Sequence, residues 1–198
     1  CPPTENFDAT QAFGSDMLAH LVATMDNLLY GVKDQSVLSK PSDKLVYYAG
    51  HDINIYFLRF FFRMNWLTTS YNRNQAMPGG MLTFQLYTAD GDEKAAAAAV
   101  SKRRKGKKGG SRGFRGKGAA ADKDDEFFVK VFFSSQTYTQ QRNVAKLGPG
   151  DAPDHVFVSI PGCNHGPESS CPYSQFVSIA QDAIREECVV STTRDRQM

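Results

Sequence analysis

The sequence lacks the features that would place it in a membrane or mark it as glycosylated. No uninterrupted apolar run reaches the roughly 18 residues that a membrane-spanning helix needs. No Asn-x-Ser/Thr sequon occurs, so there is no glycosylation acceptor to support secretion. The chain begins at Cys1 with neither a charged leader nor an apolar signal segment, and we therefore expect it to be the carboxy-terminal part of a longer protein. Its 198 residues, of which 41% are hydrophobic, can bury one sizeable core.

Acidic residues are absent from residues 102–117, which hold nine Lys and Arg. Removing these nine from the formal net charge of +2 leaves −7, so the remainder of the chain is acidic. The basic stretch lies inside a low-complexity segment, residues 89–126, with Ala runs and a closing acidic cluster. Since this segment has too little apolar surface to offset the entropy of ordering it, we expect it to be disordered.

The flanks of this segment predict that it is an insertion into a hairpin. Residues 81–87 and 127–133 are rich in aromatic and β-branched residues, which is typical of strands. We favour a solvated surface loop, because the closure cost of a loop rises only slowly with its length. The alternative is an RNA-binding or other polyanion-binding adaptor, since basic Gly-rich segments with an aromatic residue such as Phe114 attract phosphate backbones.

Three further segments predict scaffold elements. Apolar residues recur at helical spacing over 17–29, after Ser15 as a possible cap and before Gly31, which should end the helix. We expect His20 on the exposed polar face of this helix. Residues 155–160 predict a strand that begins at His155, and residues 176–184 predict a helix with Pro172 near its first turn.

Residues 44–54 place an ionisable pair at a junction. The apolar residues 45–49 predict a strand buried on both faces, Gly50 permits a sharp turn, and the run 53–66 predicts a helix. His51 and Asp52 would then lie between the carboxyl end of a parallel strand and the amino end of a helix, where open α/β sheets bind ligands. On the pair alone, a purely structural role is equally consistent, with His51 in the turn and Asp52 capping the helix.

The segment Tyr48-Ala49-Gly50-His51-Asp52-Ile53-Asn54 resembles the second catalytic motif of the histidine acid phosphatases, the branch that includes phytases and glucose-1-phosphatase. Later features follow in the order of that family, over roughly residues 44–188, and look closest to the bacterial-type phytases. They are Asn65-Trp66, Pro78-Gly79-Gly80, residues 133–137, Pro161-Gly162-Cys163, Cys171-Pro172 and Cys188.

The resemblance implies a fold for the chain. It implies an α/β protein, here the carboxy-terminal part of a three-layer αβα core with a mainly parallel sheet. Residues 1–198 would form this one domain, interrupted by the insertion at 89–126.

The same resemblance implies roles for the junction residues in hydrolysis of a phosphate monoester. His51 would hold the phosphoryl oxygens, and Asp52 would be the general acid that protonates the leaving oxygen. Asn54 is retained as a substrate-binding residue, whereas Ile53 stands where many relatives carry Thr. No metal and no cofactor is implied.

The motif that carries the nucleophilic histidine of this family, Arg-His-Gly-x-Arg-x-Pro, does not occur in these 198 residues. We therefore expect the chain to supply the proton-donor half of an active site and to need the amino-terminal part of the same protein as its partner. Alone it should be inactive. A non-catalytic relative that keeps the fold as an interaction module is a further alternative.

The even number of cysteines, together with the family resemblance, implies an oxidising environment. The resemblance implies a disulfide between Cys163 and Cys171; the rival interpretation, a zinc site that adds His165, lacks a fourth ligand. Cys188 resembles a family cysteine whose partner lies in the amino-terminal region, with Cys1 as a candidate substitute. We expect a secreted, periplasmic or lysosome-like location.

Overall fold

A computed structural model of the chain describes residues 7–31, 36–88 and 127–189. The insertion at 89–126 and Cys1 lie outside the described residues, as do the interpretations that depend on them. Helices and a sheet pack together, which confirms the α/β class. Within the described part, no helix is both long enough and apolar enough to cross a bilayer.

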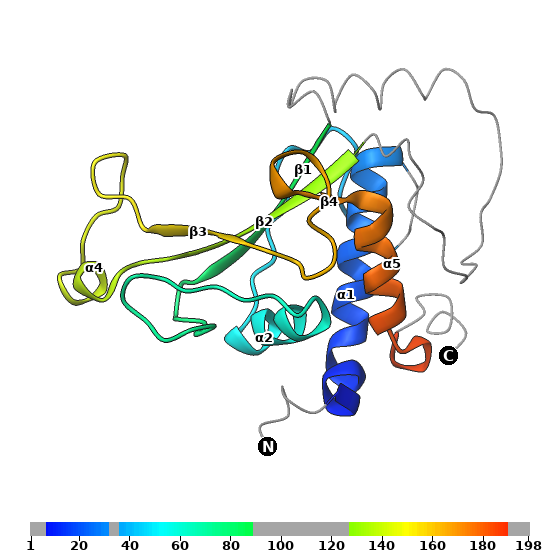
Figure 1. Ribbon diagram of the computed structural model, residues 1–198, viewed down its shortest axis with the longest axis horizontal. Coiled ribbons are helices and arrows are strands. Elements are labelled where there is room, and N and C mark those ends of the chain that lie inside the picture. Colours follow the sequence, from blue (N-terminus) through cyan, green and yellow to red (C-terminus); the bar gives the residue numbers. More distant parts are fainter. Residues whose placement is uncertain (1–6, 32–35, 89–126, 190–198) are drawn as a thin grey trace.

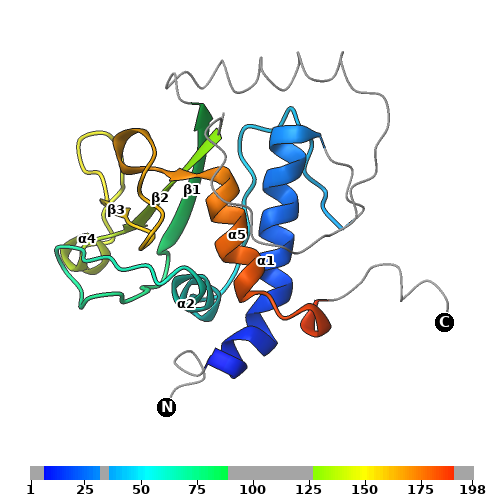
Figure 2. The same cartoon turned by 45° about the vertical axis from the view of Figure 1, so that its right-hand side comes forward.

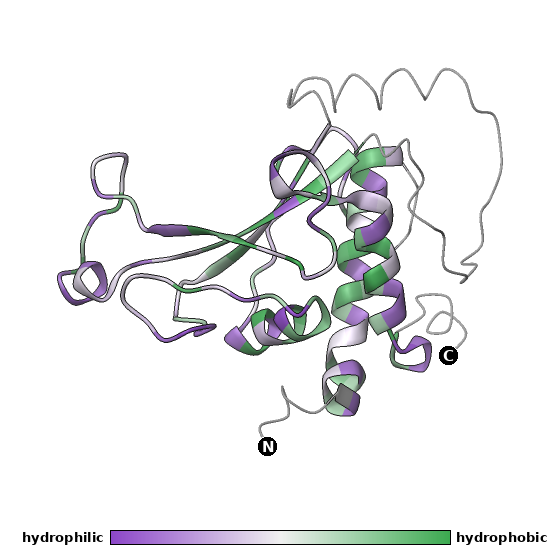
Figure 3. Cartoon of the chain, in the orientation of Figure 1, coloured by the Kyte–Doolittle hydropathy of each residue, from purple (hydrophilic) through white to green (hydrophobic). Residues whose placement is uncertain are grey.

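Three helices form a layer against the sheet. They are α1 (Phe7–Tyr30), α2 (Asp52–Phe61) and α5 (Tyr173–Ala183). Helices α1 and α5 run side by side in both views, with α2 beside them at the edge of the sheet (Figures 1 and 2). Hydrophobic residues alternate with hydrophilic ones along these helices (Figure 3), because only one side of each is needed for packing.

The helix termini differ in part from the sequence prediction. Helix α1 begins eight residues before Ser15, which lies inside it, and ends just before Gly31, whose φ of 65° is left-handed. Helix α2 ends at Phe61 rather than at Trp66. A Schellman turn stops it: Arg63 has φ 51°, and the Met64 N–H donates to the Arg59 carbonyl at 2.9 Å.

The sheet has four strands, and β2 (Phe127–Ser135) lies at its centre. It pairs with β1 (Met81–Thr88), β3 (Asp154–Val158) and β4 (Cys171–Pro172), and all three pairings are antiparallel. The predicted hairpin and the third strand are thus confirmed. In the described residues, however, no parallel pair occurs, which corrects the expectation of a mainly parallel sheet for this part of the fold. The segment that joins β2 to β3, residues 136–153, contains the short helix α4 (Tyr138–Arg142).

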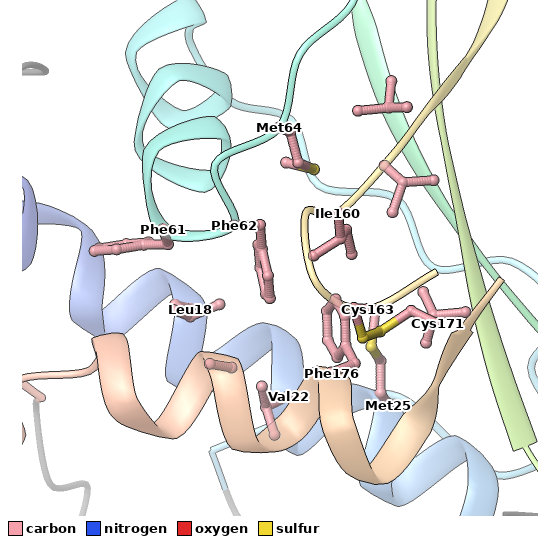
Figure 4. Close-up of a cluster of buried hydrophobic side chains, with 14 of the residues drawn as sticks. Leu18, Val22, Met25, Phe61, Phe62, Met64, Ile160, Cys163, Cys171 and Phe176 are labelled. Carbon is pink, nitrogen blue, oxygen red and sulfur yellow. A yellow bond between two sulfur atoms is a disulfide. The ribbon is translucent and has the colours of Figure 1, made fainter. Parts of the chain in front are cut away.

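The core lies between β2 and the helices. Phe127, Val129, Val131 and Phe133 alternate along β2 and are each at most 2% exposed. Phe62 stacks on Phe176 of α5 with ring centroids 4.5 Å apart, as Figure 4 shows beside Leu18, Val22 and Met25 of α1. Two short 3₁₀ turns, η2 (Pro167–Ser169) and η3 (Glu186–Cys188), complete the described chain.

Gly14 explains how α1 and α2 come close together. A Cβ at this position would lie 2.7 Å from Cε2 of Phe61, so only glycine leaves room for the buried ring. This close approach sets the α1–α2 packing that carries the His51–Asp52 junction at the start of α2.

Residues 45–49 do not form the predicted buried strand. They are extended but unpaired, and Leu45 and Tyr47 are 83% and 74% exposed. A strand needs a neighbour for its backbone N–H and C=O groups, and no described segment pairs with this one. The expectation that His51 follows a parallel strand is therefore wrong for the described part of the chain.

Candidate active site

Asn54 fixes the turn that begins α2. Its side-chain oxygen accepts a hydrogen bond from the His51 N–H at 2.8 Å, while its own N–H donates to the His51 carbonyl at 3.0 Å. His51 is the N-cap residue and has extended backbone geometry. A Cβ on Gly50 would lie 3.0 Å from that Asn54 oxygen, so any other residue before His51 would crowd the turn. In this structure Asn54 orients the pair rather than presenting a free amide oxygen.

His51 and Asp52 contact one another, as their positions in the sequence suggest. Nδ1 of His51 pairs with Oδ1 of Asp52, and the same oxygen accepts the Ile53 N–H at 2.8 Å. The imidazole is 82% exposed and the carboxyl 47% exposed, so both are accessible from solvent. The arrangement combines a potential proton donor, an imidazole and the amino end of a helix, which favours anions.

Three polar residues next to this junction were not identified as functional from the sequence. The Tyr48 hydroxyl lies 2.5 Å from Oγ1 of Thr24 and 3.2 Å from Nδ1 of His20, and the His20 and Tyr48 rings meet edge to face. Nε2 of His20 reaches the carbonyl of Ser36 at 3.0 Å. His20 is therefore partly buried and hydrogen-bonded, not on a solvent face as predicted. These contacts join segments far apart in the chain, so no local pattern could reveal them.

Arg59 of α2 and Arg63 of the turn that follows it lie away from the His51–Asp52 pair. A hollow of about 660 Å³ near the carboxyl end of the helix is lined by Arg59 and Arg63, with Asp182 of α5. Neither His51 nor Asp52 lines it. Arg63 is exposed and Arg59 is half-buried.

The cysteines form the predicted bridge. Cys163 and Cys171 are joined by a disulfide with Cα atoms 4.8 Å apart, and both are buried (Figure 4). Because both sulfurs are used, the zinc interpretation with His165 is wrong. Within residues 7–31, 36–88 and 127–189, no three His, Cys, Asp or Glu side chains gather as metal ligands. Cys188 is a half-buried free thiol.

Comparison with known proteins identifies the fold. No family model and no curated protein matches the sequence. Among solved structures, the apo phytase of Hafnia alvei superposes with a TM-score of 0.66 at 20% identity, over 93% of this chain and 37% of the phytase. The phytase of Citrobacter braakii superposes with a TM-score of 0.61 at 18% identity, over 93% of this chain and 40% of the phytase. The chain has the fold of part of a bacterial phytase.

A third phytase, from Klebsiella sp. ASR1, agrees with a TM-score of 0.59 at 18% identity and covers 96% of this chain. The chain spans 37–40% of the length of these three phytases. The phytase-like fold that the sequence predicted is thus confirmed at low identity. The roles of His51, Asp52 and Asn54 stay predictions, because a shared fold does not establish a shared site.

Proposed function

We propose that the chain supplies the proton-donor half of a phytase-like acid phosphatase, which hydrolyses phosphate monoesters through a phosphohistidine intermediate. The observation that carries the proposal is the solvent-accessible His51–Asp52 pair at the amino end of α2, in a fold shared with bacterial phytases. One of the phytases of this fold, from Hafnia alvei, has been solved in complex with myo-inositol hexakis sulphate. That complex supports a substrate class of multiply charged esters.

The proposed chemistry assigns one task to each residue of the pair. A histidine nitrogen outside this chain attacks phosphorus, a P–N bond forms and the P–O ester bond breaks. Asp52 transfers its proton to the departing oxygen, and His51 as imidazolium interacts with the charge on the phosphoryl oxygens. Water then cleaves the phosphohistidine while the Asp52 carboxylate takes up a proton. As proposed, the reaction uses protein side chains and water.

The exposed segment 45–49 is the surface at which we place the nucleophile-bearing polypeptide. Its backbone groups make no backbone–backbone hydrogen bond within the described part of the chain. Leu45 and Tyr47, on one side of the segment, are largely exposed, whereas Val46 on the other side is half-buried. An extended segment with one open apolar side and unpaired edges is suited to strand addition. We propose that the amino-terminal part of the phosphatase domain pairs here and brings its histidine to His51 and Asp52.

The Cys163–Cys171 disulfide favours an oxidising location, because thiols are kept reduced in the cytosol. We therefore place the protein in a secreted, periplasmic or lysosome-like compartment. Growth in a reducing cytosol should yield the dithiol form, which can be measured by alkylation and mass spectrometry.

The proposal is tested by complementation followed by substitution. The chain alone should show no phosphatase activity, and a mixture with an amino-terminal phytase fragment that carries the Arg-His-Gly-x-Arg-x-Pro motif should gain it. In the active mixture, Asp52→Asn should slow hydrolysis of an alkyl phosphate by about 100-fold, within the usual range for general acid catalysis. The loss on p-nitrophenyl phosphate should be smaller, since that leaving group needs less protonation.

The matched control is Asp182→Asn, which removes an exposed carboxylate of α5 that makes no ion pair within the described part of the chain. It should leave both rates unchanged. Equal losses on the two substrates for Asp52→Asn would reject the general-acid role. Turnover by the chain without an added fragment would show that the site is complete in these 198 residues.

A further inference from the structure

The segment that leads into the His51–Asp52 pair is linked to α1 by hydrogen bonds of the Tyr48 side chain. Residues 44–50 make no backbone–backbone hydrogen bond within the described residues, and they belong to no strand. The Tyr48 hydroxyl, by contrast, lies within hydrogen-bond distance of Thr24 and His20, both on α1. Thr24 and His20 are four residues apart, so their side chains project from the same side of the helix.

The hydrogen bonds of this cluster are mutually consistent. The Ser36 carbonyl can only accept, so Nε2 of His20 carries the proton of that 3.0 Å bond. In the neutral imidazole Nδ1 is then an acceptor, and the Tyr48 hydroxyl donates to it. This leaves the Tyr48 oxygen to accept from the Thr24 hydroxyl. Every donor has an acceptor, so one arrangement of protons satisfies the whole cluster.

The burial of Thr24 and Tyr48 also favours this arrangement of protons. Thr24 is 3% exposed, and Tyr48 is about half exposed. Burial raises the pKa of Tyr48 above that of a free phenol, and the Thr24 hydrogen bond opposes the shift. The phenol therefore stays protonated and remains a donor over the working range of an acid phosphatase.

We propose that Tyr48 is a positioning residue: by hydrogen bonding to Thr24 and His20 it anchors residues 44–50 to α1 and holds the His51–Asp52 pair in place for catalysis. Only two residues separate Tyr48 from His51, so movement of the tyrosine is passed on to the imidazole. This inference rests on the proposed function for its catalytic part. The anchoring itself is a property of the chain alone. Misplacement of a reacting group by about 1 Å can cost on the order of 100-fold in rate.

The first test uses the chain as it exists. Tyr48→Phe removes the hydroxyl and keeps the ring, and ¹⁵N relaxation measures the order parameters of residues 45–51. We expect values of about 0.85 in the original protein and below about 0.6 in the variant. Thr24→Val removes one of the two hydrogen bonds and leaves the bond to His20, so it should lower the order parameters of the same residues by less. Adding it to Tyr48→Phe should have little further effect, because the hydroxyl that Thr24 contacts is then already absent.

The control is Tyr138→Phe, at an exposed tyrosine of α4 whose hydroxyl makes no hydrogen bond to any residue that the structure describes. It should leave the order parameters of 45–51 unchanged. Equal order parameters in Tyr48→Phe and the original protein would overturn the anchor. So would a segment that is already mobile in the original protein.

The second test uses the complemented enzyme. Tyr48→Phe should lower kcat by about 10-fold to 100-fold with KM nearly unchanged, since the substrate still binds but the pair is misplaced. An unchanged kcat would overturn the positioning role while the proposed function stood. If the unaltered mixture has no activity at all, the proposed function fails, and the relaxation experiment still decides whether the anchor exists.

Discussion

Reduction of the Cys163–Cys171 disulfide should destabilise the chain by an amount that follows from the size of the ring it closes. The two cysteines are separated by 8 positions in the sequence. In the chain-entropy treatment, a closed loop of that length restricts the unfolded state by about 2.5 kcal/mol at 25 °C. Both cysteines are buried beside Phe176, so the bridge also lies in the core (Figure 4).

A urea titration can measure this loss through Trp66. It is the one tryptophan of the chain, is 3% exposed, and stacks on Phe133 at 4.7 Å between centroids, so its fluorescence reports on the core. With a urea m value of about 2 kcal/mol/M, a loss of about 2.5 kcal/mol lowers the midpoint by roughly 1 M. Dithiothreitol should produce this shift in the original protein.

Two variants separate the bridge from other effects of the reductant. In the double variant Cys163→Ala with Cys171→Ala, dithiothreitol should have no effect, because nothing remains to reduce. Cys188→Ser should still show the full shift, since Cys188 is free. If the reductant left the midpoint of the original protein unchanged, the loop-closure reasoning would be refuted.

Two further predictions concern the packing of the helices. Burial raises the pKa of Asp26, whereas the hydrogen bond from Tyr173 at 2.8 Å acts to lower it. The stability that the protonated carboxyl contributes is therefore present below about pH 3.9, the pKa in the unfolded chain. It is lost as the pH rises through the higher pKa of the folded state. Asp26→Asn should therefore be more stable than the original at pH 7 and equal to it near pH 3, and a gap of the same size at both pH values in urea titrations would contradict this. Phe176→Ala removes a fully buried ring stacked on Phe62 and should cost about 3–5 kcal/mol. The control Phe13→Ala, at a ring that is 72% exposed, should stay within about 0.5 kcal/mol, and similar losses for the two would argue against the assigned core.

The elements that the sequence predicts well are those stabilised by neighbours within this chain. The hairpin strands, β3 and α5 each have a local pattern and a partner among the described residues, so pattern and structure agree. Residues 45–49 have an equally apolar pattern but no described partner, and so the same kind of prediction failed there. A strand pattern indicates a capacity to pair, and the pairing itself is a long-range property.

The early start of α1 and the network around His20 were missed for related reasons. Gly14 looks like a helix breaker next to a possible cap, yet it is needed for the approach of the Phe61 ring from α2. The sequence around His20 indicates only a polar position on a helix. It cannot indicate the hydrogen bonds of His20, because its partners Tyr48 and Ser36 lie 28 and 16 residues away. For the site, the sequence located the His51–Asp52 pair and could not reveal what holds it.

The contact between α1 and the end of α5 has a consequence for biosynthesis. The Gln11 side chain donates to the Ala183 carbonyl at 2.8 Å across 172 positions, and Ser15 accepts the Arg185 N–H at 2.9 Å. At ribosomal speeds of about 5–20 residues per second, the first helix therefore waits roughly 10–30 s before its partner has been translated. During that interval the side of α1 that packs on α5 lacks this partner, so the two ends of the described fold can close only after nearly the whole chain has been made.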